Sequence, residues 1–476
     1  MSVMTNKFCV FFLTFAALCG FTSAELRLPA VISSNMVLQR DKPIPIWGWA
    51  AAGEEVTVTL GTGGKKIKSG EDGRWAVKLD ALPAGGPHEL KVKAAGKEIV
   101  LSNVLVGEVW LCSGQSNMEW SVRASKNPRE EAANAKYPNI RLFHVPKRPA
   151  TKPQDDVNAA WRECTPESVV NFSAVGYFFG RHLHGELDVP IGLIGSAWGG
   201  TRIEPWTPNA GFAAVEAVRN IGEQARAQVA QGRQLNHGSP TGLYNGMVAP
   251  IAPFSLRGAI WYQGESNNGE GMLYHEKMKA LIAGWRKVFD NPQLAFHFVQ
   301  LAPFRYGNGE RTLPYMWEAQ TATLAVPGTG MAVITDIGNV GDIHPRNKQD
   351  VGKRLALWAM AKNYGKSDLV YSGPLYKAMR IEDKSIRIAF AHAGGGLISR
   401  DGKPLSDFSI AGDDGKFVPA EARIDGATVL VNAKEVAKPK NVRFAWHHMV
   451  NPNLSNKEGL PAGPFKTDDW KGATGE

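Results

Sequence analysis

Three side chains in this sequence are of the types that nucleophilic catalysis requires. Ser116 lies in GEVWLCSGQSNMEW (107–120), where an apolar run ends in small and polar residues, and Asp342 and His344 lie in DIGNVGDIHP (336–345). A serine hydroxyl becomes a good nucleophile when an imidazole takes its proton, and a carboxylate holds that imidazole in the correct tautomer. We therefore predict Ser116 as a nucleophile, His344 as its base and Asp342 as the support of His344.

The residues around Ser116 allow a second interpretation. Gly114 permits a sharp turn that would raise the serine hydroxyl above the end of a strand. However, a serine at a helix start is more often an N-cap than a catalyst. The stretch is also not the G-x-S-x-G elbow of α/β-hydrolases, because Met118 stands in place of the second glycine. Whether Ser116 is a nucleophile or a helix N-cap therefore depends on what the other segments of the chain contain.

The middle of the chain alternates buried-strand and amphipathic-helix patterns. This alternation predicts an α/β fold with a parallel sheet flanked by helices. The predicted strands are 103–112, 189–195, 256–263, 294–302 and 330–338, and the predicted helices are 174–187, 272–289 and 351–365.

Four of these strands run directly into polar or glycine-rich loops, namely 112–118, 195–206, 262–268 and 336–345. In open α/β sheets, ligands bind at the carboxyl ends of the strands. We therefore expect one site built from four loops.

Two of these loops contain candidates for binding an oxyanion. Gly199 and Gly200 form either a simple turn or a place where a backbone N–H approaches a reacting carbonyl. The amide of Gln263 is a further candidate donor. With the N–H of Ser116 itself, these groups form the predicted oxyanion hole.

Other polar side chains of the four loops are candidates for substrate contacts. For Arg202, an internal ion pair with Glu204 is the competing interpretation, and Glu265 is an acceptor that serves the substrate or the structure. The predicted substrate-binding residues are Gln115, Asn117, Arg202, Glu265 and Asn267.

The two ends of the chain differ from its middle. Residues 1–24 combine Lys7, an apolar run and a small-residue ending at Ala24, which is typical of a signal peptide. We expect a secreted or periplasmic protein. Residues 25–102 predict a β-sandwich domain, 103–370 the catalytic domain and 371–476 a second β-rich region.

Composition excludes several partners and cofactors. The formal net charge is +9, but no basic run with interleaved aromatics is present, so we expect no nucleic-acid partner. No apolar segment after residue 24 is long enough for stable membrane insertion. Metal-ligand spacings, a G-x-G-x-x-G after a strand and a P-loop are all absent, so we predict no metal and no cofactor. Beyond the signal peptide only Cys112 and Cys164 remain, and their pairing stays open.

Five motifs in order resemble the sialate O-acetylesterase family, a branch of the SGNH/GDSL hydrolases. They are GEVWLCSGQSNMEW, PIGLIGSAWGGTRIEPW, PTGLYNGMVAPI, IWYQGESN and DIHPRNKQDVGKRLA, between about residues 104 and 365. The resemblance implies an SGNH-type sheet, and secreted bacterial members resemble the layout with flanking β regions. It implies Ser116 as nucleophile, His344 as base, and oxyanion donors at Ser116, at Gly199 or Gly200, and on a side-chain amide of 262–268.

The sequence departs from the family pattern in two places. SGNH enzymes usually carry an aspartate three residues before the histidine, where this chain has Gly341. We favour Asp342 as the support of His344 over Asp336, and a Ser-His dyad is the third possibility. The asparagine of the third block is displaced as well; Gln263 is the first choice for its role and Asn267 the second.

These observations predict a carbohydrate esterase that removes O-acetyl groups from sugars through an acetyl-serine intermediate. One alternative is an acetylxylan or other polysaccharide esterase, with specificity set by the loops 121–150 and 207–240. Another is a non-catalytic carbohydrate-binding protein, which the fourteen tryptophans would suit. A glycosidase is disfavoured, because no pair of carboxylates is evident that would flank one bond.

Overall fold

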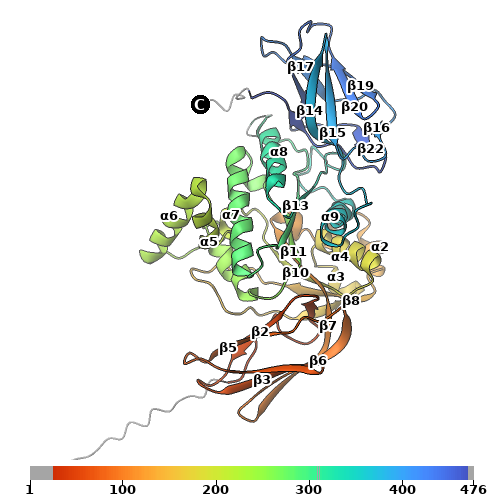
Figure 1. Cartoon of the computed structure of the whole chain (residues 1–476). Coiled ribbons are helices and arrows are strands. Elements are labelled where there is room, and N and C mark those ends of the chain that lie inside the picture. The colour runs from red at the N-terminus through yellow and green to blue at the C-terminus, as the bar shows by residue number, and fades with distance from the viewer. Residues whose placement is uncertain (1–24, 308, 310, 470–476) are drawn as a thin grey trace, which may run out of the picture.

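The computed structural model of the chain describes residues 25–307, 309 and 311–469. Three parts follow one another along the long axis of the molecule: a β region at the N-terminus, a central α/β part, and a second β region at the C-terminus (Figure 1). The predicted signal peptide, 1–24, lies outside the described residues. The order of the parts agrees with the pattern in the sequence.

The central part is built on a sheet with the strand order β13-β12-β11-β7-β10-β8-β9. Neighbouring strands from β13 to β8 run parallel, and only β9 pairs antiparallel, at the edge. This arrangement confirms the predicted α/β fold. The strands are β7 (Lys97–Gly114), β8 (Tyr137–His144), β9 (Trp161–Cys164), β10 (Ile191–Ala197), β11 (Gly258–Tyr262), β12 (Ala295–Val299) and β13 (Thr329–Ala332).

Helices cover both faces of this sheet (Figure 1). On one side α4 (Ala174–Leu187) packs against α9 (Lys348–Asn363), and on the other α7 (Met272–Val288) packs against α8 (Thr312–Ala322). The three predicted helices correspond to α4, α7 and α9. The shorter helices are α1 (Ser116–Glu119), α2 (Pro128–Ala133), α3 (Pro166–Val169), α5 (Asn209–Ala214) and α6 (Arg219–Ala230). None of the helices in the described part is long and apolar enough to cross a membrane.

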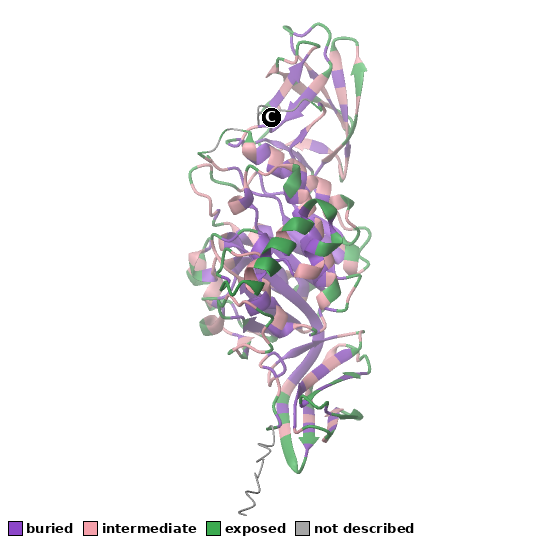
Figure 2. Cartoon of the chain, turned by 90° about the vertical axis from the view of Figure 1, so that its left-hand side faces the viewer, coloured by how far each residue is buried: buried purple, intermediate pink, exposed green. Residues whose placement is uncertain are grey.

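The long strand β7 connects the N-terminal β region with the central sheet. Its first half pairs antiparallel with β6 (Gly85–Ala94), and from Glu108 onward it lies between β10 and β11. The predicted boundary between residues 102 and 103 falls inside β7, close to this change of partners. Residues 104–114 are all buried, as the purple strand in Figure 2 shows. One continuous strand therefore leads from the N-terminal β region into the middle of the central sheet.

Both terminal regions are antiparallel, apart from β1 on β7. At the N-terminus β4, β3 and β6 continue from β7, and β2 pairs with β5. The C-terminal region has two four-stranded sheets, β14-β15-β20-β19 and β18-β17-β21-β23, and the pair β16-β22. Their bounds are β1 (Val37–Gln39), β2 (Ile44–Trp49), β3 (Glu55–Leu60), β4 (Gly63–Lys68), β5 (Arg74–Leu79), β14 (Leu375–Glu382), β15 (Ser385–Ala391), β16 (Leu397–Ser399), β17 (Phe408–Ala411), β18 (Val418–Pro419), β19 (Glu421–Asp425), β20 (Thr428–Asn432), β21 (Asn441–Phe444), β22 (Leu454–Asn456) and β23 (Phe465–Lys466).

Two segments that the sequence predicted as loops contain regular structure. β8 lies within the segment 121–150 and pairs with β10, and α6 lies within 207–240. The start of β8 carries Pro138 and Asn139, residue types that are depleted in strands. Its strand conformation depends on pairing with β10 and β9, which local sequence does not reveal.

The two cysteines of the described chain are free and buried. Cys112 lies in β7 and Cys164 in β9. Burial raises the pKa of both thiols, to about 12 for Cys164. The two thiols therefore act as small apolar groups of the core and form no disulfide with each other.

Gly114 allows the close approach of β7 and β11 and gives a stability prediction. Its φ is +142°, and an added Cβ would lie 2.1 Å from the carbonyl oxygen of Tyr262. We expect Gly114→Ala to lower the free energy of unfolding by about 3 kcal/mol or more, through backbone strain and overpacking. Urea denaturation measures this loss.

Gly53→Ala is the matched control. Gly53 also has a positive φ, of +73°, but no atom lies within 4 Å of the added methyl group. Only the conformational cost of about 1 kcal/mol then remains. Equal losses in the two variants would contradict the role of the close β7–β11 approach.

Candidate active site

Ser116 lies at the carboxyl end of β7, directly after the turn made by Gly114. The N–H of Gln115 donates to the carbonyl oxygen of Tyr262 at 3.0 Å, which ties this turn to β11. Ser116 is the first residue of α1. Its backbone N–H therefore stays outside the hydrogen bonding of the helix and remains available to a ligand.

The structure brings Ser116 and His344 together. Nε2 of His344 lies 2.9 Å from Oγ of Ser116, within hydrogen-bond distance. Both residues are half-buried, and the side chain of His344 is 25% exposed. A neutral imidazole in this position accepts the serine proton, which is the arrangement a serine nucleophile needs.

An aromatic ring and a backbone contact fix the orientation of His344. Trp120 stacks on the imidazole with ring centroids 4.5 Å apart and an interplanar angle of 14°, and its own Nε1 donates to the carbonyl oxygen of Ala124 at 2.8 Å. Oδ1 of Asp342 accepts the backbone N–H of His344 at 2.9 Å, whereas its distance to Nδ1 is 3.9 Å. Asp342 therefore holds the loop of His344 by a hydrogen bond to the backbone. Its interaction with the imidazole ring is electrostatic, without a hydrogen bond.

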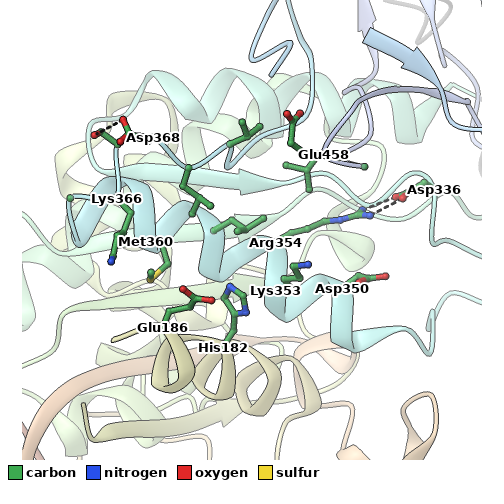
Figure 3. A pocket seen from close by; sticks show the side chains of 17 residues that line it. His182, Glu186, Asp336, Asp350, Lys353, Arg354, Met360, Lys366, Asp368 and Glu458 are labelled. Carbon is green, nitrogen blue, oxygen red and sulfur yellow. Dashed lines mark hydrogen bonds and ion pairs between the residues drawn. The ribbon is translucent and has the colours of Figure 1, made fainter. Parts of the chain in front are cut away.

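Asp336, the alternative support of His344, is bound elsewhere. Its two oxygens accept from Arg354 at 2.6 and 2.7 Å, as the dashed lines in Figure 3 show. The ion pair lines a cavity of about 1070 Å³ beside α4 and α9. Ser116 and His344 do not line this cavity. The structure therefore favours Asp342 over Asp336 as the carboxylate next to His344.

The environment of His344 lowers its pKa below the usual 6.5. Burial is the main cause, because it disfavours the charged imidazolium, and the nearby Lys348 acts in the same direction. Asp342 opposes both effects. His344 therefore stays neutral, and able to accept a proton, to a lower pH than a free imidazole does.

Gly199 lies against the nucleophile. A Cβ on Gly199 would be 3.2 Å from Cβ of Ser116, and its N–H donates to Oε2 of Glu119 at 2.6 Å. The other oxygen of Glu119 pairs with Lys147. Gly200 is exposed, with φ +74°. The Gly199 N–H thus binds a carboxylate oxygen beside Ser116, as an oxyanion donor would bind the oxygen of a substrate.

Gln263 is placed differently from the prediction. Its side chain is 0% exposed, and Nε2 donates to Oε1 of Gln115, the carbonyl oxygen of Thr201 and Oδ1 of Asn267. Asn267 in turn donates to Glu204 and Glu270. These amides are therefore engaged in hydrogen bonds inside the protein, where they hold the 262–268 loop.

Arg202 is half-exposed and takes part in an ion-pair cluster. It contacts Glu204 and Glu270, and the buried Lys277 bonds both carboxylates at 2.7 Å. The internal ion pair that the sequence suggested is therefore present. Part of the Arg202 side chain, 45% of its surface, remains exposed to solvent.

Asn117 and Glu265 belong to a polar network below the catalytic loops. Nδ2 of Asn117 donates to Oε1 of Glu265 at 2.6 Å and to the carbonyl oxygen of Ile343 at 2.9 Å. Oδ1 of Asn117 accepts from Nζ of Lys348. Burial raises the pKa of Glu265. These contacts place Asn117 between the two catalytic loops rather than on the surface.

Three residues of this site were not predicted from the sequence: Glu119, Trp120 and Lys348. Glu119 and Trp120 follow Ser116 in the same motif, and Lys348 lies four positions after His344. Their closeness to Ser116 and His344 along the chain could have marked them as candidates, whereas their contacts in space could not be read from the sequence. Among the described residues, no group of three or more His, Cys, Asp or Glu side chains is arranged to hold a metal ion.

The chain is similar in sequence and fold to known carbohydrate esterases. A family model described as carbohydrate esterase, sialic acid-specific acetylesterase, matches residues 106–360. The sialate O-acetylesterase of Homo sapiens is 31% identical over 486 aligned residues, covering 92% of both chains. That of Mus musculus is 34% identical over 414 residues, covering 75% of this chain and 76% of the other. The crystal structure of a carbohydrate acetylesterase from Xanthomonas citri has a TM-score of 0.86 and 39% identity, and covers 94% of this chain and 100% of that chain.

The fold and these comparisons define the class of the protein as a carboxylic ester hydrolase. Within this class, the chain belongs to the carbohydrate esterase family of sialic acid-specific acetylesterases. The resemblance seen in the sequence motifs is thereby confirmed.

The lowered pKa of His344 predicts the pH dependence of activity. A general base must be neutral, so kcat/KM is expected to hold at neutral pH and to fall only as the pH drops through a pKa below 6.5. The measurement is the rate of 4-nitrophenyl acetate hydrolysis between about pH 5 and about pH 8. We call the fall of kcat/KM on the acidic side of this profile the acid limb. An acid limb centred above pH 6.5 would contradict the described environment of His344.

The two candidate aspartates are expected to respond differently to substitution. Asp336→Asn leaves the buried Arg354 without its ionic partner, so we expect a loss of roughly 3–5 kcal/mol in unfolding free energy. Asp342→Asn keeps an oxygen for the N–H of His344 but removes a half-exposed charge, so stability is retained and kcat falls about tenfold.

Thermal unfolding and steady-state kinetics on both variants separate the two roles. The opposite pattern, in which Asp336→Asn loses kcat at unchanged stability, would favour Asp336 as the support of His344. An unchanged kcat in Asp342→Asn would indicate a Ser-His dyad.

Proposed function

We propose that this protein is a serine esterase that removes O-acetyl groups from sugars through an acetyl-serine intermediate. The observation that carries the proposal is the 2.9 Å contact between Oγ of Ser116 and Nε2 of His344 at the carboxyl edge of the sheet. A non-catalytic carbohydrate-binding protein would have no need of this pair. Membership of a carbohydrate esterase family supports the same conclusion.

In the first half of the reaction, Oγ of Ser116 attacks the carbonyl carbon of the acetyl ester while Nε2 of His344 takes the hydroxyl proton. The tetrahedral intermediate then collapses: the bond to the sugar oxygen breaks, and the imidazolium returns the proton to that oxygen. The sugar leaves with a free hydroxyl, and acetate remains esterified to Ser116.

In the second half, a water molecule takes the place of the sugar. His344 accepts its proton as the water oxygen attacks the acetyl carbon, and the bond to Oγ of Ser116 breaks. The proton then returns to the serine, and acetate is released. Both halves use only groups of the protein and one water molecule.

Negative charge develops on the carbonyl oxygen in both halves. We assign its binding to the backbone N–H groups of Ser116 and of Gly199 or Gly200, because Gly199 lies beside the nucleophile and Gly200 follows it. In the structure without substrate, the N–H of Gly199 donates to Glu119. In this proposal the substrate carbonyl oxygen replaces Glu119 as the acceptor of that N–H when substrate binds. Gln263 supports the hole from behind by holding the Gln115 and Asn267 side chains.

The substrate class we propose is an O-acetylated sugar, with O-acetylated sialic acid first because the mammalian relatives are sialate O-acetylesterases. The half-exposed Arg202 at the rim offers a cation to a sugar carboxylate. Acetylated xylan is the second candidate, since the similar structure from Xanthomonas citri is described only as a carbohydrate acetylesterase.

We also propose export through residues 1–24, on the basis of their signal-peptide pattern.

Ser116→Ala tests the catalytic proposal. Without its nucleophile, the folded variant should release acetate from 4-nitrophenyl acetate at least about a thousandfold more slowly. Ser113→Ala is a matched control, because Ser113 lies buried in β7 and its Oγ has no partner among the described residues. That variant should keep its rate, and circular dichroism confirms the fold of both.

The substrate follows from acetate release by the active protein on O-acetylated sialic acid and on acetylated xylan. Activity on xylan alone would replace the sialic acid proposal and leave the mechanism intact. Equal rates in Ser116→Ala and the unmodified protein would overturn the mechanism and return Ser116 to the role of a helix N-cap.

A further inference from the structure

A single amide group joins the two loops that carry the proposed catalytic pair. Asn117 follows Ser116 directly, and its Nδ2 donates at 2.9 Å to the carbonyl oxygen of Ile343, the residue before His344. The same amide nitrogen donates to Glu265 at 2.6 Å. The position of Asn117 therefore fixes how the loop of Ser116 lies against the loop of His344.

The oxygen of this amide is bound by a lysine from a third element. Lys348, the first residue of α9, is 0% exposed and its Nζ donates to Oδ1 of Asn117. The amine lies 5.2 Å from the ring centroid of Tyr262 and 6.0 Å from that of Trp120, which stacks on His344. Among the described residues, no carboxylate lies within salt-bridge distance of Nζ.

Such a burial is costly for an amine, because a charged or polar group loses water without gaining a full set of partners. Burial lowers the pKa of Lys348 to about 7, against the opposing charges of Glu265 and Asp342. An apolar residue would fill the same space at lower cost. A costly buried amine next to a proposed catalytic centre therefore indicates a function rather than a contribution to stability.

We propose that Lys348 is a positioning residue that, through the Asn117 amide, holds the nucleophile loop in register with the histidine loop. The inference rests on the proposed esterase function and assigns Lys348 no contact with substrate. Its effect is on geometry: a displacement of about 1 Å between a nucleophile and its base costs roughly a hundredfold in rate.

The protonation of Lys348 also bears on His344. The charged or titratable groups that face Lys348 are Glu265 after β11, Asp342 and His344 on one loop, and Tyr262 in β11. A protonated Lys348 opposes the imidazolium that forms when His344 takes the serine proton. A neutral Lys348 still donates to Asn117 and removes that opposition.

The test uses Lys348→Met, Asn117→Ala and the double variant, assayed with 4-nitrophenyl acetate. Methionine keeps the unbranched four-atom stem of lysine, with sulfur in place of one methylene group, and lacks the amine, so the variant is expected to fold. Each single variant should lose kcat by roughly thirtyfold to a hundredfold with KM within about twofold. The double variant should be no slower than the slower single one, because both changes break the same connection.

The pH profile adds a measurement that a merely structural role would not change. Without the amine, the acid limb of kcat/KM should move to higher pH in Lys348→Met, since the cation that lowers the pKa of His344 is gone. Lys353→Met is the matched control, an exposed lysine on the same helix. It should leave both kcat and the acid limb unchanged.

The outcomes separate this inference from the proposed function. Wild-type kcat and an unmoved acid limb in folded Lys348→Met, with Ser116→Ala inactive, would overturn the role of Lys348 and leave the esterase mechanism intact. Additive losses in the double variant would also overturn it. Equal activity of Ser116→Ala and the unmodified protein would remove both proposals. If Lys348→Met does not fold, Lys348→Leu takes its place, and the same losses are required.

Discussion

The contact between Ser116 and His344 joins residues 228 positions apart in the chain, and it depends on the parallel order of the sheet. β7 lies next to β11, and the loop of His344 follows β13 at the same edge. Parallel strands point their carboxyl ends in one direction, so loops from distant segments meet there. The close passage of Gly114 past Tyr262 then sets the height of the nucleophile above the sheet.

The polar groups around this contact have two separate tasks. Those nearest the surface are the half-buried Glu119 and Gly199, which bond each other beside Ser116, and the exposed Arg202. Those below are the buried Asn117 and Lys348 and the half-buried Glu265, and the amide of Asn117 bonds both of the others. Buried polar groups are stabilising only when they are paired, and they are correspondingly rigid. This division explains how a site made of four loops keeps a defined geometry.

Part of the fold and of the site followed from local patterns. The alternation of apolar and polar residues identified α4, α7 and α9 and the central strands, because burial on one face imposes a period on the sequence. β8 was not predicted, since its first residues favour turns and only pairing with β10 makes it a strand. The order of motifs identified the family, and the comparisons confirmed it.

Residue types and their local spacing identified the groups that are chemically able to act: a serine after a glycine turn, a histidine with an aspartate nearby, and amides at strand ends. Which of these groups meet depends on the tertiary fold. It placed His344 on Ser116, paired Asp336 with Arg354, and turned Gln263 into the interior. It also buried Lys348 behind Asn117, although lysine is a typical surface residue. The physical reason is that hydrogen bonds and burial depend on distances in space, which residue type and spacing along the chain do not specify.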